Sequence, residues 1–192
     1  MKIAIVGKGH VGTAIAKGLS GKHEIRFGHR DPKEPVRNAA AWSEVIVLAV
    51  PHSASVDVTE EVGSAADGKT VIDVSNAVSE EGELALGFTT SAAEEIQKLL
   101  PKAHVVKAFN TVFAGNQSTG RVGNEQLTLF VAADDAEAKQ KVMQLGRDIG
   151  FDAVDAGPLK SARYLEPMGM LMIDLGFTLR MGTKMGYKLA RA

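Results

Sequence analysis

The stretch "MKIAIVGKGHVG", residues 1–12, decides the expected fold of this chain. Its apolar residues 3–6 predict a short strand, and glycines follow at positions 7, 9 and 12. Residues 10–19 then carry apolar side chains at helical spacing. A strand, a G-x-G-x-x-G turn and a helix in this order form the dinucleotide-binding motif in the context that it requires.

Each glycine of the turn has its own role in that motif. Gly7 permits the tight turn out of the strand, Gly9 lets backbone N–H groups approach a pyrophosphate, and Gly12 lets the helix pack closely on the strand. The positive end of the helix faces the phosphates, so the backbone of the loop matters more than its side chains. The residues expected at the phosphates are Gly7, Lys8, Gly9, His10, Val11 and Gly12.

The rest of the chain continues the alternation of strands and helices. Several apolar runs, such as "VIVLAV" at 45–50, are continuous, which is typical of strands covered on both faces. The order predicts an α/β fold with a doubly wound, mostly parallel Rossmann sheet in one domain over residues 1–192. Strands are expected at 2–6, 24–27, 45–50, 70–74, 104–108, 127–132 and 152–155. Helices are expected at 10–19, 55–64, 91–100 and 136–149.

The last 35 residues have a different composition and hold five of the seven methionines. We expect residues 158–192 to form a C-terminal helical extension packed on the domain, kinked or broken at Pro167 and at the glycines that follow. Methionines in such a segment favour a core or a subunit interface over a ligand pocket.

Composition excludes several classes of function. The 22 basic and 23 acidic residues nearly cancel, which leaves no field to attract nucleic acid or anionic lipid. The absence of cysteine excludes disulfides and thiolate chemistry. No apolar run approaches the roughly 18 residues of a membrane span, and the five histidines have no metal-ligand spacing. We expect a cytoplasmic protein with no metal site and no membrane partner.

The second expected strand ends in "GHRDPKEPVR", residues 28–37, where such folds bind the ribose of the adenosine. Arg30 stands at the position where NAD enzymes carry an acid, with His29 beside it and Lys33 following. A guanidinium suits the 2′-phosphate of NADP, whereas a carboxylate repels it. Asp31 could hold a ribose hydroxyl, but a capping or turn role is favoured. The segment therefore predicts NADP(H) over NAD(H).

Polar residues and a proline follow three later strands. Pro51 offers a flat apolar surface for a nicotinamide, although it could simply terminate its strand. Ser75 with Asn76, and Asn110 with Thr111, supply short polar groups at two further strand ends. Any one of these could be turn chemistry. Because the carboxyl ends of parallel strands share one edge, the three together predict a cofactor cleft.

No arrangement of side chains suggests covalent, acid–base or metal catalysis, so the chemistry is expected to come from the cofactor as hydride transfer. The protein would then position two rings and exclude water.

Five stretches of the chain resemble motifs of the NADPH-dependent reductases of the deazaflavin coenzyme F-420. They are "GKGHVG" (7–12), "LAVP" (48–51), "DVSN" (73–76), "VVKAFNTV" (105–112) and above all "DAGPLKSARYLE" (155–166). The NADPH-binding domains of metalloreductases with a six-helix membrane part carry similar motifs. The resemblance runs from residue 1 to about residue 190.

The resemblance implies an NADP-dependent oxidoreductase that assembles as a homodimer and acts on a small-molecule electron acceptor. NADP(H) would lie along the glycine loop, and the deazaflavin would lie between the fourth and fifth strand ends and the C-terminal helices. Hydride would pass directly between the two rings, with no catalytic side chain. The cofactor-binding residues beyond the glycine loop would be His29, Arg30, Lys33, Val50, Pro51, Asn76, Ala77, Asn110 and Ala114.

The chain also departs from that family. Asn110 stands where archetypal members have histidine, and the glycine loop is shorter. The acceptor therefore stays open: coenzyme F-420 is favoured, and a flavin, a quinone or a ferric chelate is the alternative. A non-catalytic NADP(H)-binding sensor is a third hypothesis, which predicts that Pro51 is buried against Leu171 or Met172. A reductase needs an open pocket there.

Overall fold

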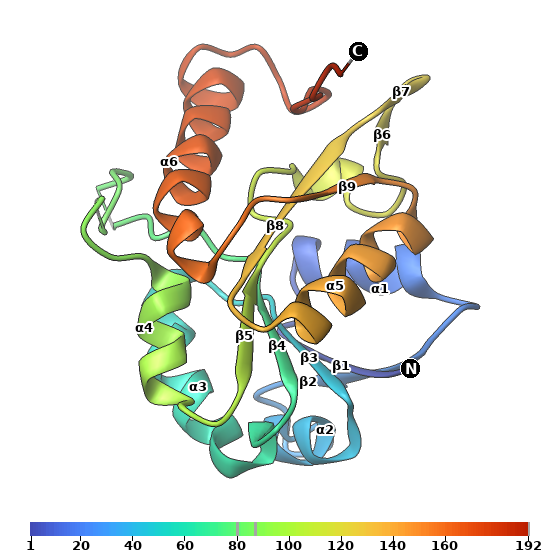
Figure 1. Cartoon of the computed structure of the whole chain (residues 1–192), viewed down its shortest axis with the longest axis vertical. Coiled ribbons are helices and arrows are strands. Elements are labelled where there is room, and N and C mark those ends of the chain that lie inside the picture. Colours follow the sequence, from blue (N-terminus) through green and yellow to red (C-terminus); the bar gives the residue numbers. More distant parts are fainter. Residues whose placement is uncertain (80, 87, 192) are drawn as a thin grey trace.

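The computed structural model describes residues 1–79, 81–86 and 88–191. Its centre is a seven-stranded sheet in the order β2-β1-β3-β4-β5-β8-β9 (Figure 1). The strands are β1 Lys2–Val6, β2 Glu24–Gly28, β3 Val45–Leu48, β4 Thr70–Asp73, β5 His104–Lys107, β8 Thr128–Ala133 and β9 Asp152–Asp155. All seven occupy the expected places, with ends that differ by at most two residues.

The sheet is mostly parallel, as the sequence predicts. β2, β1, β3, β4 and β5 pair in parallel, with Val47 of β3 between Ile5 of β1 and Ile72 of β4. β8 runs antiparallel to β5, and β9 is parallel to β8. A reversed strand at this end of the sheet was not predicted, since an apolar run does not encode its own direction.

Helices cover both faces of the sheet because alternate residues of each strand point to opposite sides. Ile3 and Ile5 of β1 pack with α1 His10–Leu19 and α5 Ala136–Ile149. Ala4 and Val6 pack on the other face with α2 Val36–Trp42, α3 Ser55–Val62 and α4 Ala92–Leu99 (Figure 1). The two resulting cores hold the sheet rigid beneath the loops at its carboxyl edge.

Local signals explain the ends of some helices. Asp135 begins α5 by accepting a hydrogen bond from Ala138 N at 2.8 Å, and Gly150 ends it with φ of 124°. Ser91 begins α4 by accepting from Glu94 N. α2 was not predicted; Pro35 is the residue that precedes its first turn.

A small hairpin also escaped prediction. β6 Arg121–Val122 and β7 Glu125–Gln126 are too short to leave an apolar pattern in the sequence.

The C-terminal segment corrects one expectation, since its described residues, 158–191, are only partly helical. α6 Ala162–Ile173 passes through Pro167 and continues as a π-helical turn over Asp174–Thr178. The helix then stops at Arg180, whose φ of 57° is left-handed. The remaining described residues run without regular structure toward the start of β8, where Tyr187 O accepts from Thr128 N at 2.9 Å.

No helix in residues 1–79, 81–86 and 88–191 is long and apolar enough to cross a membrane.

Candidate functional site

A cavity of about 500 Å³ lies where the glycine loop, the end of β2 and the end of β3 meet. This is the point at which the chain leaves β1 toward β2 on one side and β3 on the other, the switch point at which doubly wound sheets bind ligands. We call it the glycine-loop cavity. Its lining includes Gly7, Lys8, Gly9, His29, Arg30, Val50 and Pro51.

The three glycines of the loop differ in what surrounds them. Gly7 has φ of 105°, and a Cβ there would lie 2.2 Å from Ala49 O. A Cβ on Gly12 would lie 2.2 Å from Gly7 O, which confirms that this glycine brings α1 close to the strand. A Cβ on Gly9 would meet no atom within 4 Å and would project into open space. Gly9 is therefore not needed for packing, and its bare backbone leaves room for a ligand.

The strand ends form a second cavity of about 730 Å³, which we call the strand-end cavity. It shares Gly9, Val50 and Pro51 with the glycine-loop cavity, so the two cavities adjoin each other. Its further lining includes His10, Val11, His52, Ser75, Asn76 and Ile173 of α6. Pro51 is exposed, so the C-terminal segment does not cover it.

A smaller hollow of about 230 Å³ lies beneath α6 and is lined by Val11, Asn76, Asn110, Ala114, Met172 and Phe177, among others.

The charged residues after β2 are not all directed to the glycine-loop cavity. Arg30 and His29 line it, but Lys33 lines a separate surface hollow beside Phe27. Asp31 accepts a hydrogen bond from Lys33 N at 2.9 Å, which is a turn and not a helix cap. Lys8 is paired with Glu34 at 3.0 Å. Arg30 is thus the cation that this segment presents to the cavity.

Three buried polar atoms at the strand ends have no hydrogen-bond partner among the described residues: Ser75 Oγ, Asn110 Oδ1 and His52 Nδ1. Ser75 and Asn110 are 8% and 7% exposed. Burying a polar atom without a partner costs on the order of 1–3 kcal/mol, which makes these atoms candidates for hydrogen bonds with a bound group or water. A carboxamide, with a donor and an acceptor, fits this set.

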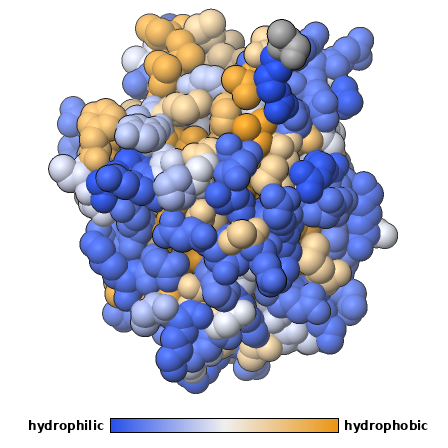
Figure 2. Space-filling model, in the orientation of Figure 1, coloured by the Kyte–Doolittle hydropathy of each residue, from blue (hydrophilic) through white to orange (hydrophobic). Residues whose placement is uncertain are grey.

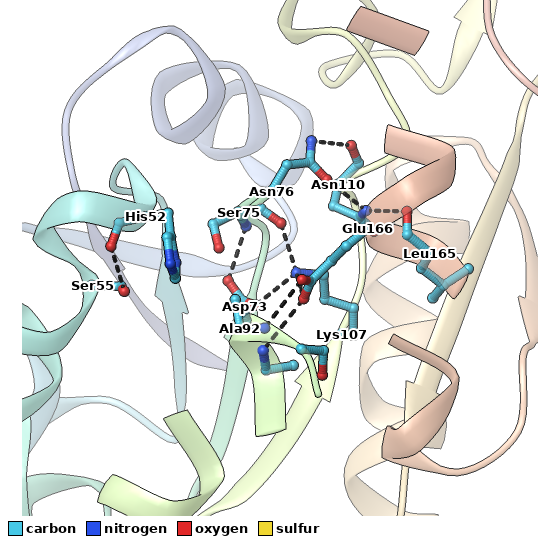
Figure 3. Close-up of polar contacts among 12 residues, drawn as sticks. His52, Ser55, Asp73, Ser75, Asn76, Ala92, Lys107, Asn110, Leu165 and Glu166 are labelled. Carbon is cyan, nitrogen blue, oxygen red and sulfur yellow. Dashed lines mark hydrogen bonds and ion pairs between the residues drawn. The ribbon is translucent and has the colours of Figure 1, made fainter. Parts of the chain in front are cut away.

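The side chains of Asn76 and Asn110 hold each other at the floor of these cavities (Figure 3). Asn110 Nδ2 donates to Asn76 Oδ1 at 2.9 Å and to Leu165 O at 2.7 Å. Asn76 Nδ2 donates to Asn110 O at 3.1 Å. The close approach of α6 depends on Gly169, because a Cβ there would lie 2.2 Å from Asn76 Oδ1. The amide pair therefore joins β4, β5 and α6 at one point.

Behind this pair lies a cluster that the sequence analysis did not single out. The ammonium of Lys107 contacts Asp73 Oδ2 at 2.7 Å and Glu166 Oε1 at 2.8 Å, and all three side chains are no more than 1% exposed. Burial disfavours the charge of Lys107, but the two carboxylates outweigh it and hold its pKa above the ordinary value. The interleaved charges of "VIDV", "VVKA" and "RYLE" were the available signal.

The structure thus brings most of the predicted cofactor-binding residues to neighbouring cavities. Three lie elsewhere. Gly12 is buried under the loop, Ala77 is fully buried and lines none of the three cavities described above, and Lys33 faces the separate hollow.

Comparison with known proteins identifies the family, although no family model matches the chain. The chain is 29% identical to the F-420-dependent NADP reductase of Methanothermobacter marburgensis, over 91% of this chain and 92% of that protein. A crystal structure from Arthrobacter sp. FB24, provisionally named an F-420-dependent NADP reductase, has a TM-score of 0.93 at 30% identity, with both chains fully covered. The chain belongs to the F-420-dependent NADP reductase family. Family membership makes it an oxidoreductase and agrees with the Rossmann architecture.

The chain is also similar to metalloreductases. The chain is 31% identical to the metalloreductase STEAP3 of Rattus norvegicus over 90% of its own length, and that match covers 37% of the rat protein. The match thus spans 37% of the length of the rat protein. It spans 21% of the length of each of the other two metalloreductases.

Proposed function

We propose that this chain transfers a hydride between NADP(H) and the deazaflavin coenzyme F-420. The observation that carries the proposal is that the two cavities adjoin at Gly9, Val50 and Pro51, with Arg30 lining the first and Ile173 of α6 lining the second. When bound, NADPH would supply the hydride. The chain would bind and orient the two partners, with no side chain acting on the hydride itself.

The residues divide this task along the cleft. The N–H groups at the start of α1 would hold the diphosphate, with Gly9 leaving room for it. Arg30, beside His29, would pair with the 2′-phosphate. Ser75 Oγ would form a hydrogen bond with the nicotinamide carboxamide, while Val50 and Pro51 would face the ring. Asn110 lines the smaller hollow beneath α6, next to this cavity.

The open strand-end cavity favours a reductase over a sensor. A sensor would bury Pro51 against Leu171 or Met172. Instead Pro51 is exposed, the side chain of Leu171 is 51% exposed, and Met172 packs into the smaller hollow. An acceptor would have room to lie against the nicotinamide from this side.

A second candidate is an NADPH-dependent reductase of another acceptor, a flavin, a quinone or a ferric chelate. The similarity to metalloreductases supports a ferric acceptor, although the chain spans only 37% of the rat protein. Both candidates share the NADP(H) half of the cleft and differ in what enters the strand-end cavity.

The test mixes the purified protein with NADPH and oxidised F-420 under anaerobic conditions and follows the visible band of the deazaflavin. Parallel reactions contain riboflavin, a quinone or ferric citrate in its place. Bleaching of the deazaflavin at a rate far above the other acceptors supports the proposal. No bleaching, with reduction of another acceptor, selects the second candidate.

We also propose that the protein is a cytoplasmic homodimer joined through its C-terminal segment. Large apolar side chains there are exposed, among them Leu171, Phe177, Leu179 and Met181. Figure 2 shows apolar residues gathered around the end of α6. Light scattering should give twice the 20.3 kDa chain mass, and Leu179→Asp should reduce it to one chain. A single-chain mass for the unaltered protein at a concentration on the order of 10⁻⁴ M would contradict the homodimer.

A further inference from the structure

The buried cluster of Asp73, Lys107 and Glu166 draws its members from three elements, β4, β5 and α6 (Figure 3). Lys107 uses all three of its N–H bonds: they reach Asp73 Oδ2, Glu166 Oε1 and Ser75 O at 2.7, 2.8 and 2.6 Å. An ammonium is therefore the only form of Lys107 that satisfies every partner.

Both carboxyl groups of the cluster accept hydrogen bonds through both of their oxygens. Asp73 Oδ1 accepts from Ser75 N at 2.9 Å, and Glu166 Oε2 accepts from Ala92 N at 3.1 Å, while the other two oxygens accept from Lys107. Every carboxyl oxygen thus faces an N–H donor, and none faces an acceptor that a carboxylic acid proton would need. Two carboxylates and one ammonium leave the cluster with one net negative charge.

This charge lies directly behind the wall of the strand-end cavity. The Ser75 carbonyl that Lys107 contacts belongs to a residue of that wall, and Val74 and Asn76 line it on either side. Among the described lining residues, the titratable side chains are His10 and His52, so no carboxylate lies on the wall itself. Because the cluster is buried, its field reaches the cavity with little screening.

The N-terminus of α4 offsets part of the charge. Its Ala92 and Ala93 N–H groups donate to Glu166 at 3.1 and 3.4 Å, and a helix end supplies roughly half a positive charge. Roughly half a negative charge therefore remains on the cluster and the helix end taken together.

We infer that the Asp73–Lys107–Glu166 cluster makes the strand-end cavity favour the cationic nicotinamide of NADP⁺ over the neutral ring of NADPH. This inference rests on the proposed function, which puts the nicotinamide in that cavity. Asp73 and Glu166 touch no ligand and act through space, as electrostatic positioning residues. Their field would favour hydride donation by NADPH, because donation leaves a positive ring in the cavity.

The test compares the Kd of NADP⁺ with the Kd of NADPH by calorimetry, without any acceptor. Glu166→Gln and Asp73→Asn each remove one buried negative charge. Each should raise the ratio of the NADP⁺ Kd to the NADPH Kd by roughly fivefold to tenfold, as expected for a unit charge on the order of 10 Å away in a protein interior. A merely structural role would weaken both nucleotides equally and leave the ratio unchanged.

Glu94→Gln is the matched control. It also removes one negative charge between α4 and α6, where Glu94 pairs with Arg163 at 2.7 Å, but its side chain is 19% exposed and lies away from the cavity wall. In this variant the ratio of the NADP⁺ Kd to the NADPH Kd should stay within about twofold of the ratio in the unaltered protein, which is on the order of the experimental error.

The outcomes separate this inference from the proposed function. An unchanged ratio in folded Glu166→Gln and Asp73→Asn overturns the inference, even if F-420 is reduced. A raised ratio supports it, even if another acceptor is used. No binding of either nucleotide by the unaltered protein overturns both.

Discussion

The two ends of the candidate site carry charge in opposite ways. At the β2 end, the cations stand at the surface: the Lys8 side chain is 48% exposed, and Arg30 is exposed at the cavity mouth. At the β4–β5 end, Lys107, Asp73 and Glu166 are sealed from solvent and bonded only to one another and to the backbone. The exposed cations at the β2 end are accessible to a ligand, whereas the buried charges at the β4–β5 end are paired within the protein.

This difference separates the residues that determine folding stability from those that determine ligand selectivity. Exposed charges contribute little to folding, about 0–1 kcal/mol a pair, so Arg30 is free to select a ligand. Buried charges lose their hydration when the protein folds, so each one needs an opposite charge or hydrogen-bond partner inside the protein. Their substitution should therefore affect the whole fold, whereas substitution of the surface cations should affect binding alone.

The largest expected effect comes from removing the cation of the buried cluster. Lys107→Met leaves two carboxylates buried without a cation, and should lower the free energy of unfolding by about 3–5 kcal/mol. Lys102→Met, at a surface pair with Asp67 whose lysine is 75% exposed, is the control and should change it by less than about 1 kcal/mol. Urea unfolding followed by circular dichroism measures both. Equal effects of the two substitutions would refute the contrast between the ends.

A glycine pair sharpens the same contrast within the loop. Gly9→Ala adds a methyl group that meets no protein atom, so the protein should stay folded while its affinity for NADPH falls by about tenfold or more. Gly12→Ala places a methyl group 2.2 Å from Gly7 O and should instead lower the melting temperature. Calorimetry and thermal unfolding of both variants distinguish the two roles. Full affinity in Gly9→Ala would place the diphosphate elsewhere.

The smallest effect concerns a half-way case, the partly buried pair of Glu94 and Arg163. The hydrogen bond from Arg163 holds the pKa of Glu94 below its ordinary value. The stabilisation is therefore present above the unfolded-state pKa, about 4.3, and is lost as pH falls through the folded-state pKa. Glu94→Gln should cost about 1 kcal/mol at pH 7 and progressively less as the pH falls below about 4.3, measured by urea unfolding across this range. A cost that does not change with pH would show that the charge of Glu94 is unimportant.

The sequence predicted the β2 end better than the β4–β5 end, for a physical reason. The glycine loop works through local backbone geometry, and its spacing can be read from adjacent residues. Asp73, Lys107 and Glu166 stand up to 93 positions apart, and only the tertiary fold brings their charges together. The motifs that carried the family resemblance contain these residues, but their spacing alone does not reveal the cluster.

The elements that were mispredicted have related causes. β8 reverses because of its place in the sheet, which its residues do not encode. The tail after Thr178 has helix-forming residues, yet it is irregular because Asn116 Nδ2 and Thr128 N bond its backbone carbonyls at Thr183, Met185 and Tyr187. Tertiary hydrogen bonds override the local propensity there.

The central claim, that the glycine-loop cavity selects NADP(H), is tested most directly by calorimetric titration of the unaltered protein and Arg30→Asp with NADPH and NADH. We predict that the unaltered protein binds NADPH at least about tenfold more tightly than NADH, and that Arg30→Asp abolishes this preference while leaving NADH binding within about threefold. No heat with either nucleotide, or an NADPH preference that survives in Arg30→Asp, would contradict the account.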